Sequence, residues 1–392
     1  MKILRKQIET IIKFIKTNQL EFIILAFILL LAAFLRLYRI ADYMTFLGDE
    51  GRDVLVVKRI IVDHKFTLLG PTASVGGFFL GPFYYYLMVP FLWLFRLNPV
   101  GPAVMVALFG LATVFLLYKV GREFFDSWVG LLAAGFYAIS PLVIAYSRSS
   151  WNPNLMPFFS LLIIWLTRKL VLEKKPQFLG LVGFLLGLTI QLHYLAVFLM
   201  VVIGIYLLLF FRRFKYLKYY FGAIGGFILG WSPFLLFELR HHFPNFRTLY
   251  RFILFGEEVG FVAQKFLPIV TDVSFRLFNR LVVNNQTILA HLLLFLTLMI
   301  FVFNWFKKRK QKGFLATYSL LGLWLLVGVT LFGFYQKPIY DYYLGFMFPL
   351  PFLLTALVFN KIAKKSRLFG CLVVWLSLTC KASLSAIRLT VN

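Results

Sequence analysis

The sequence predicts an all-α polytopic membrane protein with about 11 transmembrane helices, since each span needs roughly 20 apolar residues. Hydrophobic residues make up 61% of its 392 residues, charged residues only 14%, and the apolar runs are long and unbroken. A membrane barrel would instead alternate polar and apolar residues along short strands. The predicted spans are 20–38, 101–118, 128–146, 156–172, 178–192, 194–211, 219–237, 288–306, 314–334, 343–360 and 368–386.

Charge in the short loops predicts how these spans are oriented. If the lysine-rich N-terminus is cytoplasmic, every short loop on that side carries at least two Lys or Arg residues, as the positive-inside rule requires. These loops are 119–127, 168–175, 212–218, 307–312 and 361–367. They account for most of the net charge of +26, so no nucleic-acid partner is expected. We therefore expect a multi-pass protein of the cytoplasmic (inner) membrane.

The number of spans depends on whether segment 82–96 crosses the membrane. This segment is ambiguous, because it is short, aromatic and interrupted by Pro90. If it crossed the membrane, every later loop would change sides and the basic loops would lie outside. We therefore expect interfacial helices on the outer face, within an outer loop 39–100. A second outer loop, 238–287, is expected to form the site face together with the first, within a single domain 1–392.

Polar and ionisable residues gather in these outer loops and at the outer ends of the spans. The adjacent carboxylates Asp49 and Glu50 and the nearby Arg52 follow the first span. Further candidates are Arg148, Asn152, His193, Glu238, His241, Lys337, Asp341 and Tyr342. Ionisable groups near membrane depth favour a functional site. A carboxylate there can act as a general base toward a hydroxyl, and an arginine or lysine can hold a phosphate.

Four stretches follow one another in the order GDEGRDVLVVKRI (48–60), GPFYYYLMVPFLWLF (81–95), WVGLLAAGFYAISPLVIAYSR (128–148) and DYYLGFMFPLPFLL (341–354). As an ordered set they resemble the GT-C membrane glycosyltransferases, in particular the superfamily of protein O-mannosyltransferases and lipid A aminoarabinose transferases. The resemblance implies a GT-C-like bundle. It also implies transfer of a sugar from a polyprenyl-phosphate donor to a lipid, glycan or protein acceptor at the outer face.

The resemblance implies catalytic roles for Asp49, as the base that activates the acceptor, and for its neighbour Glu50. Arg52, Arg148 and Lys337 are the candidates for binding the donor phosphate, Lys337 more by position than by motif. Asn152, His193, Glu238, His241, Asp341 and Tyr342 are candidates for substrate binding. A direct displacement, which inverts the anomeric carbon, is expected.

The chain departs from the family at two places. Leu80 and Gly81 stand where the aminoarabinose transferases have Glu-Lys, and Asn152 and Asn154 follow Ser-Arg where many relatives have an Asp. These departures leave metal dependence open, so no cofactor is certain and a divalent metal ion stays an alternative. Adjacent histidines do not face one site on a helix, which argues against a metal held by His241 and His242 alone.

Two other classes of function stay open. A lipid or small-molecule transporter would need ionisable groups at mid-membrane and discontinuous helices in paired halves. The charges of this chain lie at helix ends instead, which argues against a transporter. A non-catalytic scaffold would keep the fold without the chemistry. Cys371 and Cys380 lie in one apolar run and are expected to face lipid or the core.

Overall fold

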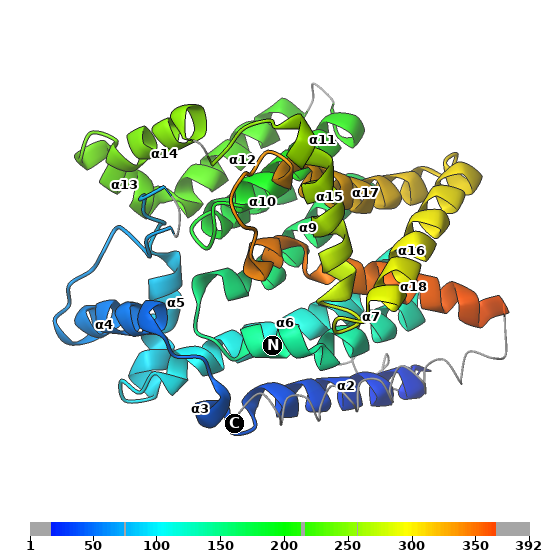
Figure 1. The fold of residues 1–392 in the computed structure, drawn as a ribbon, viewed down its shortest axis with the longest axis horizontal. Helices are drawn as coiled ribbons and strands as arrows, with labels where there is room; N and C mark the ends of the chain where they lie inside the picture. Colours follow the sequence, from blue (N-terminus) through cyan, green and yellow to red (C-terminus); the bar gives the residue numbers. More distant parts are fainter. Residues whose placement is uncertain (1–16, 74–75, 213–215, 257, 366–392) are drawn as a thin grey trace, which may run out of the picture.

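A computed structural model describes residues 17–73, 76–212, 216–256 and 258–365, and every regular element in these ranges is a helix (Figure 1). Extended pairing there is limited to two isolated bridges, Thr72 with Phe79 and Val259 with Tyr335. The predicted all-α fold is confirmed. The predicted span 368–386, with Cys371 and Cys380, lies outside the described residues, as does the lysine-rich start of the chain.

Long apolar helices form the body of the molecule. Five described helices, or up to eight if each bent pair counts as one span, are long and apolar enough to cross a membrane. The unbent ones are α2 (Gln19–Leu37), α6 (Val100–Phe124), η1 with α9 (Asn152–Leu155, Met156–Leu172), α16 (Thr287–Lys308) and α17 (Lys312–Phe332). Two shorter apolar helices, α10 (Phe178–Thr189) and α11 (Ala196–Phe210), match further predicted spans. The predicted count of about 11 is consistent with this set.

Three predicted spans are bent pairs of helices rather than single rods. They are α7 and α8 (Ser127–Ile139, Pro141–Ser147; 68°), α12 and α13 (Leu217–Gly230, Ser232–Arg240; 71°), and η3 and α18 (Asp341–Met347, Pro349–Lys365; 62°). In each pair the second helix carries a proline at its first or second position: Pro141, Pro233 or Pro349. Because proline lacks an N–H and clashes with the preceding turn, it starts a new helix instead of continuing the old one.

A buried arginine closes the break between α7 and α8. Arg36 of α2 is 0% exposed and donates hydrogen bonds to Ala138 O at 2.9 Å and to Tyr137 O at 3.2 Å. A continuous helix would give Tyr137 O the N–H of residue 141, which Pro141 does not have. The guanidinium therefore satisfies carbonyl groups that the break leaves without helical partners.

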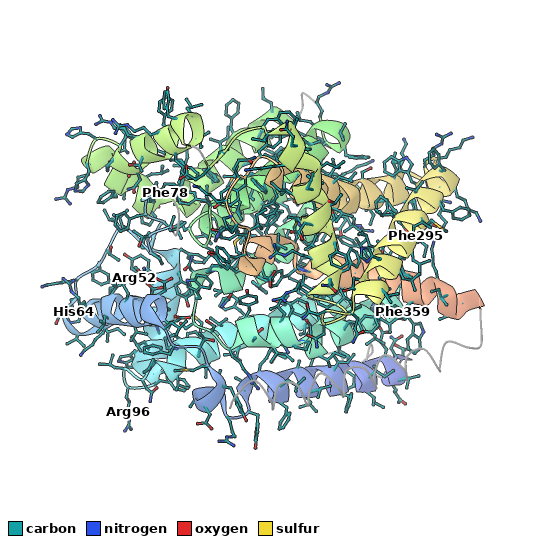
Figure 2. The ribbon with its side chains drawn as sticks, viewed as in Figure 1. Arg52, His64, Phe78, Arg96, Phe295 and Phe359 are labelled. Carbon is teal, nitrogen blue, oxygen red and sulfur yellow. The ribbon has the colours of Figure 1, made fainter. Side chains whose placement is uncertain are left out.

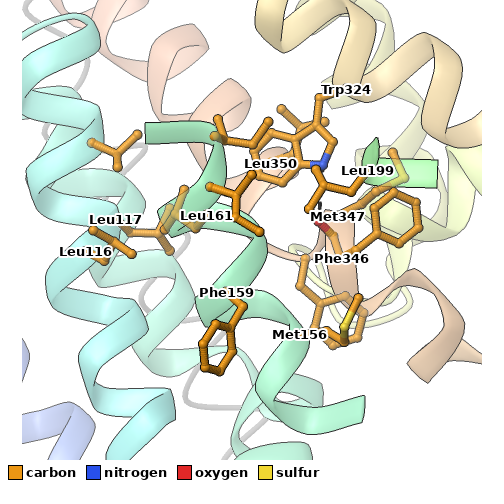
Figure 3. Close-up of a cluster of buried hydrophobic side chains, with 14 of the residues drawn as sticks. Leu116, Leu117, Met156, Phe159, Leu161, Leu199, Trp324, Phe346, Met347 and Leu350 are labelled. Carbon is orange, nitrogen blue, oxygen red and sulfur yellow. Dashed lines mark hydrogen bonds between the residues drawn. The ribbon is translucent and has the colours of Figure 1, made fainter. Parts of the chain in front are cut away.

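A tightly packed core holds the central helices together. Side chains of α6, α9, α17 and α18 meet in it, among them Leu117, Leu161, Trp324 and Leu350 (Figure 3). Trp324 also donates a hydrogen bond from Nε1 to Phe346 O at 3.1 Å, which ties η3 to α17. Because buried side chains are close-packed, this core fixes where η3 lies.

Shorter helices gather at the left of the molecule in Figure 1. They are α4 (Gly48–Val62), α5 (Phe83–Leu94), α13 and α14 (Pro244–Phe255); α3 (Ile40–Tyr43) precedes them and α15 (Ala263–Asn279) follows. Asn245 of α14 joins the segment before α5 to helix α13. It accepts a hydrogen bond from Phe79 N at 2.8 Å and donates one to Glu238 at 2.7 Å. With 12 residues, α5 has the same length as α10, so its length does not test the prediction that it stays out of the membrane, and that prediction remains open.

Candidate active site

A cavity of about 410 Å³ lies where these shorter helices meet the central bundle. Asp49 and Arg52 line one side of it, and Asn152, His193 and Tyr342 line another. In Figure 2, Arg52 and Phe78 mark two of its walls, α4 and the Thr72–Phe79 bridge. The remaining lining is mainly apolar and includes Phe198, Leu249, Phe252, Ile253, Leu331 and Phe332. The cavity therefore has a polar part and a large apolar part.

Asp49 is the carboxylate that reaches this cavity. It lies in the first turn of α4, where the helix dipole favours a negative charge. Its Oδ1 accepts a hydrogen bond from Arg52 Nη1 at 2.9 Å, as the i, i+3 spacing allows on a helix. The Asp49 side chain is 49% exposed, so a substrate in the cavity can reach it.

Glu50, although adjacent to Asp49, is only 4% exposed. Its Oε2 accepts a hydrogen bond from Leu47 N at 3.0 Å, and its Oε1 accepts one from the Ser149 hydroxyl at 2.9 Å. Glu50 thereby fixes the start of α4 against the segment that follows α8. These contacts describe a positioning role, and direct catalysis by Glu50 stays a prediction.

A second carboxylate holds Arg52 from its other side. Asp53 Oδ1 accepts hydrogen bonds from Arg52 Nε at 3.0 Å, from Arg52 Nη2 at 2.8 Å and from the Tyr85 hydroxyl at 2.9 Å. Burial raises the pKa of Asp53 to about 6, although Arg52 and Tyr85 favour the charged form. Asp53 was not among the predicted site residues. The signal was present, since carboxylates flank Arg52 at positions 49 and 53.

Aromatic rings form the wall that η3 contributes. The ring centroids of Trp151 and Tyr342 are 4.3 Å apart, and those of His193 and Tyr343 are 5.5 Å apart. Leu195 N donates to His193 Nδ1 at 3.2 Å, which places the proton of the neutral imidazole on Nε2. Desolvation lowers the pKa of His193 to about 4, so the ring is neutral at pH 7.

Five predicted site residues therefore line one cavity, although they come from distant parts of the chain: Asp49, Arg52, Asn152, His193 and Tyr342. Asn152 also shapes it, because its Nδ2 donates to Leu192 O at 2.6 Å and holds the turn that carries His193. Trp151 and Tyr343 line the cavity as well and were not predicted. Each lies next to a predicted residue, but nothing in the sequence indicated which neighbour faces inward.

The other six candidates do not line the cavity. Besides Glu50, they divide into residues engaged elsewhere and residues at the surface. Glu238 accepts hydrogen bonds from Asn245 and Phe246, and Asp341 pairs with Arg276 at 2.5 Å and with Arg280 at 2.9 Å.

Arg148 donates to Leu35 O and lies over the Tyr43 ring, 5.1 Å from its centroid. Lys337 is exposed, and the exposed His241 stacks on Phe237. The geometry lends their predicted binding roles no support, so those roles stay predictions.

No three His, Cys, Asp or Glu side chains come together to hold a metal ion within the described part of the chain. Asp49 faces Arg52 and Glu50 is bound by Leu47 and Ser149, so neither offers a ready set of metal ligands. The described residues thus assemble no metal site, and a divalent metal ion stays an open alternative.

Gln191 takes the space that a side chain at position 81 would fill. A Cβ on Gly81 would lie 2.3 Å from Gln191 Oε1 and 2.5 Å from its Cγ, closer than real Cβ contacts. Gln191 is held there by hydrogen bonds from Nε2 to Gly187 O at 3.1 Å and to Gly230 O at 2.6 Å. This packing explains how the chain accommodates a glycine where the aminoarabinose transferases have a lysine.

The comparisons with known proteins agree with this architecture. Residues 80–237 match a family model described as dolichyl-phosphate-mannose-protein mannosyltransferase. ArnT from Cupriavidus metallidurans, bound to undecaprenyl phosphate, superposes with a TM-score of 0.58 at 14% identity. The oligosaccharyltransferase of Archaeoglobus fulgidus, in complex with Zn and sulfate, gives 0.55 at 14% identity. Its structure with an inhibitory peptide and a dolichol-phosphate, where it is named AglB, gives 0.53 at 13% identity.

These matches cover 92%, 93% and 96% of this chain, but 63%, 51% and 55% of the solved chains. The chain thus spans about half to two thirds of the length of the structures it matches. No curated protein matches it in sequence. The chain has the fold of the GT-C membrane glycosyltransferases, which confirms the resemblance seen in the sequence, and it is a multi-pass membrane protein.

Proposed function

We propose that this chain transfers a sugar from a polyprenyl-phosphate donor to an acceptor hydroxyl, with Asp49 as the base. The observation that carries the proposal is the Asp49–Arg52 pair at a cavity that is polar on one side and apolar on the other. A cavity of this kind suits an amphiphilic donor, since its apolar part accepts the first isoprene units and its polar part accepts the phosphate and the sugar.

Arg52 is the cation placed to bind the donor phosphate. Its Nη1 reaches the cavity side, where it now contacts Asp49 and lies 3.5 Å from the Thr72 hydroxyl. A guanidinium binds phosphate oxygens as well as it binds carboxylates. Donor phosphate at Nη1 would therefore replace Asp49 and leave that carboxylate free for catalysis.

The reaction is a single displacement. Asp49 takes the proton of the acceptor hydroxyl as its oxygen bonds to the anomeric carbon. The bond from that carbon to the phosphate oxygen breaks, and polyprenyl phosphate leaves with the electron pair, stabilised by Arg52. Trp151 and Tyr342 offer aromatic faces for the sugar ring, and His193 offers a neutral N–H. The anomeric carbon is inverted.

The setting of this reaction is the outer face of the cytoplasmic membrane. The basic short loops support a cytoplasmic N-terminus, which places loops 39–100 and 238–287 outside. A lipid-linked donor would then reach the cavity from the bilayer, and the acceptor, whether lipid, glycan or protein, would approach from outside. Undecaprenyl phosphate and dolichol-phosphate, which are present in the ArnT and AglB structures, are the donor carriers to test first.

The test is sugar transfer by the purified full chain in proteoliposomes, from a panel of polyprenyl-phosphate sugars and with extracted envelope lipids and glycans as acceptors. Among the described lining residues the only charged side chains are Asp49 and Arg52, and Asp49 is used as the base. Because no second carboxylate there can pair with an ammonium group, a neutral sugar is expected to transfer faster than an amino sugar. The product should carry the inverted anomeric configuration. Absence of transfer from every donor would contradict the proposal, and transport of the intact donor would favour the transporter alternative.

A further inference from the structure

Asp53 is a buried carboxylate next to the cavity that the proposed reaction does not use. It is 0% exposed, and its Oδ1 accepts three hydrogen bonds, two from Arg52 and one from Tyr85. Its Oδ2 is buried with no hydrogen-bond partner among the described residues. A buried carboxylate with one unsatisfied oxygen is costly to keep, so its presence calls for a reason.

The contacts of Arg52 supply that reason. Asp53 holds one edge of the guanidinium, Nε at 3.0 Å and Nη2 at 2.8 Å, from the buried side. The remaining nitrogen, Nη1, reaches Asp49 at the half-exposed side. A planar guanidinium held along one edge has its third nitrogen aimed in a fixed direction. The inner edge is thus fixed, while the outer nitrogen is able to change partners.

We infer that Asp53 is a positioning residue that acts through Arg52, fixing the guanidinium so that Nη1 exchanges Asp49 for the donor phosphate. This inference rests on the proposed function. The exchange couples two events, because binding of the phosphate also frees Asp49 to act as base. Tyr85 supports the arrangement by donating a third hydrogen bond to the same Asp53 oxygen, from the neighbouring helix α5.

A purely structural tether between α4 and α5 is the competing explanation. The groups around Asp53 are Arg52 and Asp49 on α4 and Tyr84 and Tyr85 on α5. With its pKa raised from 3.8 to about 6, Asp53 stabilises the fold fully only below about pH 4, and this contribution is lost as the pH rises through 6. A tether and a positioning residue are separated by what Asp53→Asn changes, stability in the first case and donor binding through Arg52 in the second.

The test is a double-mutant cycle on binding of undecaprenyl phosphate to the full chain in nanodiscs at pH 7.5. Asp53→Asn should weaken binding about tenfold, which corresponds to about 1.4 kcal/mol. The same change should have no further effect in an Arg52→Lys background, because lysine cannot be held along an edge. Asp63→Asn, an exposed carboxylate at the end of the same helix, is the matched control and should bind like wild type.

Two further readouts separate positioning from tethering. Asp53→Asn should unfold at pH 7.5 at the same temperature as wild type or higher, whereas a lost tether would lower that temperature. Its binding defect should shrink toward pH 5, where wild-type Asp53 is itself protonated. If Asp53→Asn does not fold, Tyr85→Phe replaces it in the same cycle, with a smaller expected loss of two- to threefold, about 0.5 kcal/mol.

Wild-type affinity in Asp53→Asn, or an equal loss in the Arg52→Lys background, overturns the inference. If those results come from a chain that binds undecaprenyl phosphate and transfers sugar, the proposed function stands and only the role of Asp53 fails. A wild-type chain that does not bind undecaprenyl phosphate overturns both.

Discussion

Asp49 and Glu50 differ in environment because neighbouring residues on a helix point about 100° apart. Asp49 is 49% exposed and faces Arg52 at the cavity, whereas Glu50 turns inward to Ser149 and the start of its own helix. The sequence predicted the pair as a site but could not say which carboxylate is free. That depends on the segment after α8, which lies about a hundred residues away in the chain.

His193 should make the stability of the protein depend on pH. Its pKa falls from 6.5 to about 4, so the folded state binds fewer protons than the unfolded state between these values. Stability is then lost as the pH falls from 6.5 to 4, by up to about 3 kcal/mol. Thermal unfolding at pH 7 and pH 5 should show a smaller acid-induced loss in His193→Gln than in wild type. An equal loss in both proteins would contradict this assignment.

At the scale of elements, the broken helix α7–α8 depends on Arg36. Arg36→Met removes the donors to Tyr137 O and Ala138 O and should destabilise the protein by about 3 kcal/mol, measured by thermal unfolding in detergent. Pro141→Ala returns an N–H to the break, so the double variant should recover part of the loss. If Pro141→Ala gives no recovery, the guanidinium is not acting as the cap of this break.

The packing of Gly81 against Gln191, just before α5, gives a second prediction about an element. Gly81→Ala should lower the unfolding temperature, because the new Cβ would meet Gln191 at 2.3 Å. Adding Gln191→Ala removes the obstructing atoms and should restore most of the stability of the Gly81→Ala protein. Gln191→Ala alone is the matched control. Equal unfolding temperatures for Gly81→Ala and wild type would show that the neighbouring side chain simply moves away.

At the scale of the whole molecule, composition and loop charge were enough to predict an all-α membrane protein, and the described helices occupy the predicted spans. The bends were not predicted, because hydropathy does not register that Pro141 or Pro349 starts a new helix. The site and its candidate residues were predicted, but not which of the candidates line the cavity. Asp53 and Trp151 face inward only because α5 and η3 pack beside them, and such long-range contacts leave no local pattern.

The same reasoning explains which candidates lost support. Arg148, Glu238 and Asp341 are polar residues near helix ends, as a site would require, but backbone groups and ion pairs engage them instead. Buried polar groups must find partners somewhere, and a sequence does not distinguish a partner in the protein from one in a substrate. Asp49 and Arg52 keep their support because both line the cavity, where a substrate can reach them.

The central claim is that Asp49 is the base for sugar transfer, and the most direct measurement is single-turnover transfer from a polyprenyl-phosphate sugar by wild type, Asp49→Asn and Asp63→Asn. Loss of a general base costs about 10²–10⁴ in rate, so Asp49→Asn should slow transfer by that factor while still binding undecaprenyl phosphate. Asp63→Asn should transfer at the wild-type rate. Transfer by Asp49→Asn at the wild-type rate would contradict the account.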